Sequence, residues 1–188
     1  MSGTPTETEV AGGRKNDPLR KQRITEAAAR VIAERGIDGL TFRSVALAAK
    51  VPLGSTTYYF ADKDELVTAA ISVFRERSTE LFRDLLTDFV TELGLAGGVA
   101  ALVEEMTVRR HSVLVADYRI YLSLLGRPQL ASGQPGWDLA DLLRPHCSPA
   151  TARLLSYVVE GILIKAVMED VMVFAAELEP LLRRITDA

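Results

Sequence analysis

The chain has 188 residues, of which 48% are hydrophobic and 25% charged, and its formal net charge is −3. This is enough apolar sequence for a sizeable core, in one helical domain or two modest subdomains, and the net acidity excludes a wholly basic nucleic-acid coat protein. The N-terminus lacks the apolar core of a secretory signal, and no uncharged apolar run approaches the roughly 18 residues that cross a bilayer. Cys147 is the only cysteine, so no internal disulfide can form, and we expect a cytoplasmic location.

Charge is distributed unevenly along the chain. From residue 14 to 63, ten lysines and arginines against five aspartates and glutamates give +5. From residue 64 to the end, twelve against eighteen give −6. A basic segment joined to an acidic remainder indicates a nucleic-acid-binding module attached to a second part.

The first 16 residues are polar, contain glycine and show no periodicity, which predicts a disordered arm. Arg14 and Lys15 at its end are candidates to touch DNA; the alternative is a leader that touches nothing. A helix follows, with Asp17 as a candidate N-cap, Pro18 at the first position and Gly36 at the end. Its expected buried stripe is Ile24, Ala27, Ala28, Val31 and Ile32.

Residues 40–66 have the pattern of two short helices at a sharp turn, followed by the capped start of a third. Thr41 is the expected N-cap of the first helix, and Pro52 forces the turn. The second helix, residues 53–59, is nearly free of formal charge and rich in hydroxyl groups, which suit close approach to phosphates and base edges. Asp62 and Glu65 form a capping box that opens a long helix. The apolar stripe of the first helix is Phe42, Val45, Ala46 and Ala49.

The pattern T-x-x-x-V-A-x-A-A-x-V-x-x-G-S-x-x-Y-x-F-x-x-K-D-E-L, from Thr41 to Leu66, resembles the helix-turn-helix of the TetR (tetracycline-repressor-like) family of transcriptional regulators. The resemblance covers about residues 24–71. The family usually has glycine where Lys50 stands, and a non-glycine residue in a left-handed cap costs on the order of 1 kcal/mol. The family's recognition-helix tyrosine and histidine fall on Thr57 and Tyr59, so Tyr58 and Tyr59 are both candidates for the phosphate contact.

The resemblance implies an all-α protein in three parts: the arm 1–16, a three-helix helix-turn-helix DNA-binding domain 17–62, and a helical effector-binding and dimerisation domain 63–188. It also implies a dimeric repressor that leaves a palindromic operator in double-stranded DNA when a small, mostly apolar effector binds. An architectural DNA-binding protein without effector and an all-helical small-molecule carrier are the alternatives.

Two cations are singled out for DNA contact. Arg43 is the first candidate for a base contact, because arginine can donate two hydrogen bonds to guanine; a phosphate or solvent contact is the alternative. Lys63 lies at the positive end of a helix, where it does not stabilise the dipole, so a phosphate partner is favoured over a solvated lysine. Residues 53–56 are expected to face the major groove. The full candidate set is Thr41, Arg43, Leu53, Gly54, Ser55, Thr56, Thr57, Tyr58, Tyr59 and Lys63.

The long helix is expected to run about 30 residues to Gly94, or roughly 45 Å, with residues 75–80 as its exposed or bent section. Further helices are expected at about 99–110, 111–125, 137–143, 151–170 and 174–185, with a loop at 132–136. Pro180 must lie near the start of the last helix or kink it. Surplus apolar faces on the last two helices predict a homodimer through a four-helix bundle at about 149–186; a large monomeric core is the alternative.

Aromatic or pliable side chains on the divergent helices are the candidate effector lining, with simple core packing as the alternative for each. No metal site is predicted, because His111, His146 and Cys147 are neither repeated nor spaced as chelating pairs. No nucleophile elbow, phosphate loop, dinucleotide fingerprint or HExxH helix occurs, so the sequence predicts no enzyme and no cofactor. The candidate lining is Phe82, Met106, Tyr118, Tyr121 and Trp137.

Overall fold

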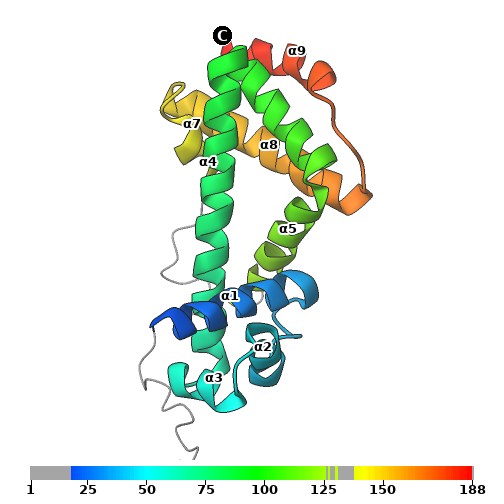
Figure 1. Ribbon diagram of the computed structural model, residues 1–188. Coiled ribbons are helices and arrows are strands. Elements are labelled where there is room, and N and C mark those ends of the chain that lie inside the picture. The colour runs from blue at the N-terminus through cyan, green and yellow to red at the C-terminus, as the bar shows by residue number, and fades with distance from the viewer. Residues whose placement is uncertain (1–17, 126, 128–129, 131–137, 188) are drawn as a thin grey trace, which may run out of the picture.

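The computed structural model describes residues 18–125, 127, 130 and 138–187, and every regular element in them is helical, as the all-α prediction required (Figure 1). The expected arm 1–16, the Asp17 cap and the expected loop 132–136 lie outside these described residues. The elements are α1 (Pro18–Arg35), α2 (Phe42–Ala49), α3 (Leu53–Tyr59), α4 (Lys63–Glu104), the π-helical turn η1 (Glu105–Arg109), α5 (His111–Leu125), α7 (Leu139–Leu143), α8 (Pro149–Glu169) and α9 (Ala175–Thr186).

Helix α1 ends as its sequence predicts. Gly36 has a φ of 73°, and its N–H donates to the carbonyl of Ile32 at 2.8 Å. Only glycine adopts this left-handed conformation without steric cost. The chain then reverses and buries Ile37, which is 3% exposed.

Helices α1 to α3 pack at one end of α4, with α1 lying across it (Figure 1). The buried side chains there form one cluster, called the first core below. It also takes in residues from the start of α4 and from the second half of α5, so it joins the three-helix head to both long helices. Its largest members are Ile24, Ile32, Leu40, Phe60, Leu66, Ile71, Ile120 and Leu124.

The long helix breaks at Gly94, as the sequence predicts, but it does not bend at residues 75–80. Residues 75–80 continue the helix without a break, and Ser78 in their middle is buried. The chain instead turns at Gly94, whose φ of 73° and ψ of 176° lie outside the helical region. Glycine can adopt these angles freely, whereas a polar stretch bends a helix only when packing or backbone chemistry demands it.

The second part of the chain packs around a separate cluster, called the second core. It is built from α4 on both sides of Gly94, η1, α5, α7, α8 and α9. Ser148 caps α8 by accepting the N–H of Thr151, and Pro149 takes the first helical position, as predicted. Pro180 lies inside α9, which continues past it to Thr186. The fully enclosed members of the second core include Phe82, Leu102, Met106, Leu139 and Leu155.

By length and composition alone, one described segment, residues 63–109, could cross a membrane. Its most apolar stretch is 44% buried inside the protein, and the turn at Gly94 interrupts it. Core helices pass the same test, so the segment is accounted for by its packing.

Candidate nucleic-acid interface and effector site

The turn between α2 and α3 is fixed by local hydrogen bonds. Thr41 Oγ1 accepts the N–H of Ser44 at 3.0 Å, and Ser44 Oγ accepts the N–H of Thr41 at 2.9 Å, which completes a capping box at the start of α2. At the other end, the N–H groups of Lys50 and Val51 return to carbonyls of the last turn, including that of Ala46. These bonds satisfy both ends of an eight-residue helix and set the direction of α3.

Lys50 itself is left-handed, with φ 55° and ψ 46°. The helix therefore ends as it would with glycine, although the side chain costs on the order of 1 kcal/mol there. The expected departure thus affects local stability more than geometry.

One side of α3 faces solvent. Tyr58 is 59% exposed and Leu53 is 51% exposed, and Gly54 and Thr57 are exposed with them. These four positions give a short helix a continuous outer surface, as a DNA-reading helix requires. Ser55 is half-buried.

Thr56 does not belong to this outer surface. Its side chain is fully buried, and its hydroxyl donates to the carbonyl of Leu53 at 2.7 Å. The placement of residues 53–56 in the groove was therefore wrong for Thr56. A helix turns about 100° per residue, so four consecutive side chains cannot share one face.

The two neighbouring tyrosines have different environments. Tyr59 is half-buried and packs against the first core, whereas Tyr58 is exposed. Their rings meet edge to face with centroids 5.0 Å apart. The core-bound ring of Tyr59 thereby supports Tyr58, whose side chain is the more exposed of the two.

Two exposed cations flank α3. Arg43 on α2 and Lys63 at the first position of α4 form no ion pair with any residue that the structure describes. Asp62 Oδ1 accepts the N–H of Glu65 at 2.8 Å, and Glu65 Oε2 accepts that of Ala61 at 2.7 Å. The two carboxylates thus cap the start of α4, and the ammonium of Lys63 is available to a phosphate.

The predicted effector residues come from three elements of the second part. Phe82 on α4 and Met106 on η1 are fully buried in the second core. Tyr118 on α5 packs against this core. Tyr121 is 54% exposed, and its ring meets the ring of Tyr118 edge to face, with the centroids 6.3 Å apart. Trp137 lies outside the described residues.

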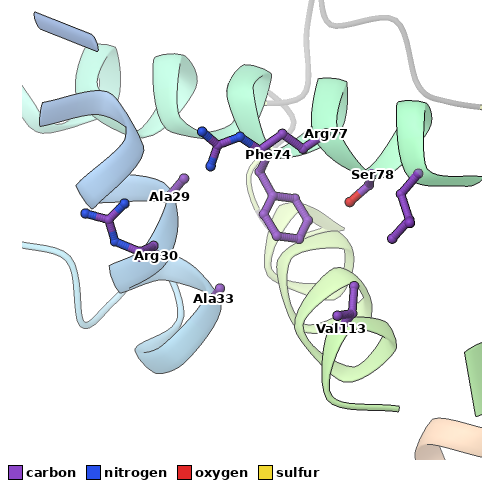
Figure 2. Close-up of a pocket in the computed structure, with 8 residues that line it drawn as sticks. Ala29, Arg30, Ala33, Phe74, Arg77, Ser78 and Val113 are labelled. Carbon is purple, nitrogen blue, oxygen red and sulfur yellow. The ribbon is translucent and has the colours of Figure 1, made fainter. Parts of the chain in front are cut away.

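An open hollow of about 230 Å³ lies between α1, α4 and α5 (Figure 2). Its floor is mainly apolar, and the ring of Phe74 projects into it from α4. None of the predicted effector residues lines it. Sequence reasoning missed this site, because its walls come from helices whose crossing is set by tertiary packing. The lining is Ala29, Arg30, Ala33, Phe74, Arg77, Ser78, Leu81 and Val113.

A buried carboxylate is hydrogen-bonded to Ser78, one of the residues that line this hollow. Asp117 on α5 is 9% exposed, and its Oδ1 accepts a hydrogen bond from Ser78 at 2.7 Å. Its Oδ2 is buried with no hydrogen-bond partner among the described residues. Burial raises the pKa of Asp117 from 3.8 to about 6, and the Ser78 hydrogen bond partly opposes this. The available sequence signal was a lone acid within an otherwise apolar face of α5.

Comparisons with known proteins agree with this architecture. The family model for bacterial regulatory proteins of the tetR family matches residues 24–77. A solved member of the TetR family from Streptomyces coelicolor is 33% identical, with a TM-score of 0.71, and the likeness covers 90% of this chain and 99% of that one. The chain belongs to the TetR family. The multidrug binding protein EbrR, solved with imidazole, is 35% identical to this TetR-family chain with a TM-score of 0.73, over 90% and 96% of the two chains.

Curated relatives of this TetR-family protein are transcriptional regulators. PksA of Bacillus subtilis is 38% identical over 66 residues, and the transcriptional repressor KstR2 of Mycobacterium tuberculosis is 28% identical over 96 residues. The matched stretches are 35% and 51% of this chain, and they span only 32% of PksA and 48% of KstR2.

The buried carboxylate gives this TetR-family protein a measurable pH dependence. Because the folded pKa of Asp117, about 6, exceeds the unfolded value near 3.8, the native state holds the extra proton between these pH values and loses stability as pH rises through them. This difference between the folded and unfolded pKa corresponds to at most about 3 kcal/mol of stability. From pH 4 to pH 7.5, Asp117→Asn should therefore gain up to this amount relative to the wild type, as measured by urea unfolding. The exposed carboxylate variant Asp84→Asn should shift by less than ~0.5 kcal/mol, and parallel curves for Asp117→Asn and the wild type would contradict the assignment.

Proposed function

We propose that this TetR-family protein is a dimeric repressor that binds a palindromic operator and leaves it when a small effector binds its C-terminal part. The observation that carries the proposal is the outward face of α3, where Tyr58 and Leu53 are exposed. Arg43 and Lys63, in the elements before and after it, are exposed and form no ion pair within the described residues. Neither Tyr58 nor Leu53 is buried in a core, so this face of α3 is open to a partner.

In this proposal Arg43 and Leu53 read bases, and Tyr58 and Lys63 bind phosphates. Arginine can grip guanine O6 and N7 with two hydrogen bonds, and a leucine side chain suits a thymine methyl. Thr41 and Thr57 are exposed nearby and can add polar contacts. Thr56 contributes only through its backbone, because its side chain is buried.

The proposed division of labour places DNA binding in residues 17–62 and effector binding and dimerisation in residues 63–188. The first core crosses this boundary, because Leu66 and Ile71 of α4 and Ile120 of α5 are part of it. Two further bonds join the same parts: Arg119 donates to the carbonyls of Ala33 and Glu34 at the end of α1, at 2.9 and 3.0 Å. A shift of α5 would therefore be passed directly to α1 and to the helices α2 and α3 that pack with it.

Exposed apolar side chains on α8 support the dimer. Their spacing places them on one side of the helix, with Gly161 between them. They are Leu154, Tyr157 and Met168. Tyr157 and Met168 are 70% and 76% exposed. Leu181 on α9 adds a further exposed apolar group. Two copies of this surface could bury one another about a twofold axis, as in most homodimers.

A small-molecule effector is supported by the relatives. EbrR is a multidrug binding protein that has been solved with proflavin, at 34% identity and a TM-score of 0.73, and with ethidium, at 34% and 0.74. KstR2 is named a transcriptional repressor. An effector need only prefer the conformation that binds DNA poorly, and a coupling of about 1 to 3 kcal/mol weakens DNA binding about 5- to 150-fold.

The DNA contacts can be tested on a duplex selected from random sequence. Arg43→Ala should weaken binding to the selected site by about 1 to 3 kcal/mol and relax preference at one base per half-site. Lys63→Ala should weaken binding to all sequences and reduce the salt slope by about one per subunit. Fluorescence anisotropy across a salt series measures both. Arg153→Ala, an exposed cation on α8, is the matched control; the assignment fails if it behaves like the other two.

The dimer surface can be tested by matched tyrosine variants. Tyr157→Lys should convert the dimer to a monomer, because it places a charge in the middle of the apolar surface of α8. Tyr58→Lys makes the same change on α3 and should remain dimeric. Sedimentation equilibrium separates the two. A wild-type monomer at tens of micromolar, or a dimer unaffected by Tyr157→Lys, would contradict the proposal.

A further inference from the structure

The carboxylate of Asp117 is an unusual choice for its position. It lies among side chains of both cores, with Leu114 and Ile120 of α5 buried on either side in the chain. One oxygen is satisfied by Ser78 and the other has no partner among the described residues. An ionised carboxylate in such surroundings is costly unless an opposite charge joins it.

The described part of the chain supplies no such charge. Arg77 at the rim of the hollow pairs with Glu26 of α1 at 3.1 Å, and Arg119, two residues along α5, donates to carbonyls of α1. Arg30 on the rim is exposed. None of these forms an ion pair with Asp117. Burial raises the pKa of Tyr118, the next residue on α5, above its usual range, and the charges of Glu160 on α8 and of Asp117 add to this.

Two tyrosines follow Asp117 along α5. Tyr118 and Tyr121 lie one and four positions after Asp117 on α5, and their rings meet edge to face. The hydroxyl of Tyr118 donates to the carbonyl of Glu160 at 3.2 Å, which fixes that ring between α5 and α8. Ser156, also on α8, donates to Glu160 Oε1 at 3.0 Å. Tyrosine faces attract cations, and desolvation strengthens the attraction.

We infer that the effector is a small organic cation, such as a quaternary or protonated amine with an apolar body, and that Asp117 is its counter-charge. This inference rests on the proposed effector function. The apolar body would lie on the apolar floor of the hollow, against Phe74, Leu81 and Val113. A hollow of about 230 Å³ suits a one- or two-ring amine, since drug-sized ligands occupy roughly 300 to 1,000 Å³.

The position of Asp117 also connects such a ligand to the head. Its hydrogen bond to Ser78 joins α5 to α4 at the point where the two cores meet. A cation that binds the carboxylate would compete with this hydrogen bond. The second half of α5, with Ile120 and Leu124, lies in the first core, so a shift of α5 there displaces α1.

The inference can be tested with two probes of nearly equal shape, 3-hydroxyphenyltrimethylammonium and 3-tert-butylphenol, which differ in charge. Calorimetric titration at pH 7 should show that the full chain binds the ammonium at least tenfold more tightly than the phenol. Asp117→Asn should lose at least tenfold in ammonium affinity while its phenol affinity changes less than twofold. The exposed variant Asp84→Asn should match the wild type. At pH 5, below the Asp117 pKa of about 6, the wild-type preference should shrink severalfold, which tests the charge without any substitution.

Equal affinity for the two probes, no binding of either at 10 mM, or a charge preference that survives Asp117→Asn would overturn the inference. The same samples are titrated onto the selected duplex. If neutral compounds release the protein from the duplex as well as the ammonium does, the inference of a cationic effector is overturned and the repressor proposal stands. Ammonium binding that depends on Asp117, in a protein that ignores every duplex, overturns the repressor proposal instead.

Discussion

The packing of α1 against both α4 and α5 is the constraint on which the rest of the structure depends. Ile24 and Ile32 of α1 share one core with Ile71 of α4 and Ile120 of α5. Arg119 adds hydrogen bonds to the last carbonyls of α1, which no intrahelical donor can reach. Arg127 pairs with Asp38 just beyond α1. The three-helix head that carries α3 is thereby held at a defined angle to α4 and α5. A shift of α5 would change that angle.

Several residues at the sites lower stability. Lys50 adopts a left-handed backbone where glycine would be relaxed, and the side chain of Tyr58 is mostly exposed to water. Asp117 keeps one buried oxygen that has no hydrogen-bond partner in the described part of the chain. Each is a local departure from what the surrounding structure favours. Such departures concentrate at binding sites, where the stabilising partner is another molecule. The position of Asp117 at the junction of the two cores makes it the departure best placed to affect DNA binding.

The head was predictable because its signals are local. The Thr41 cap, the Pro52 turn and the span of α3 follow from neighbouring residues, and the structure confirms all three. The break of the long helix at Gly94 was predicted from its glycine, whereas residues 75–80, the second candidate for a bend, continue the helix because Ser78 in their middle packs inside the protein. Thr56 was placed outside because its chemistry suited DNA, whereas its position on the helix decides its direction. Asp117 and the hollow depend on how distant helices cross, which one sequence does not reveal.

The central claim is that two copies of α3 enter DNA together, and hydroxyl-radical footprinting of the complex with the selected duplex tests it most directly. A twofold dimer predicts two protected backbone segments on one face of the duplex, with centres about 34 to 36 Å or one helical turn apart. A single protected segment, or no protection at low salt, would contradict the account.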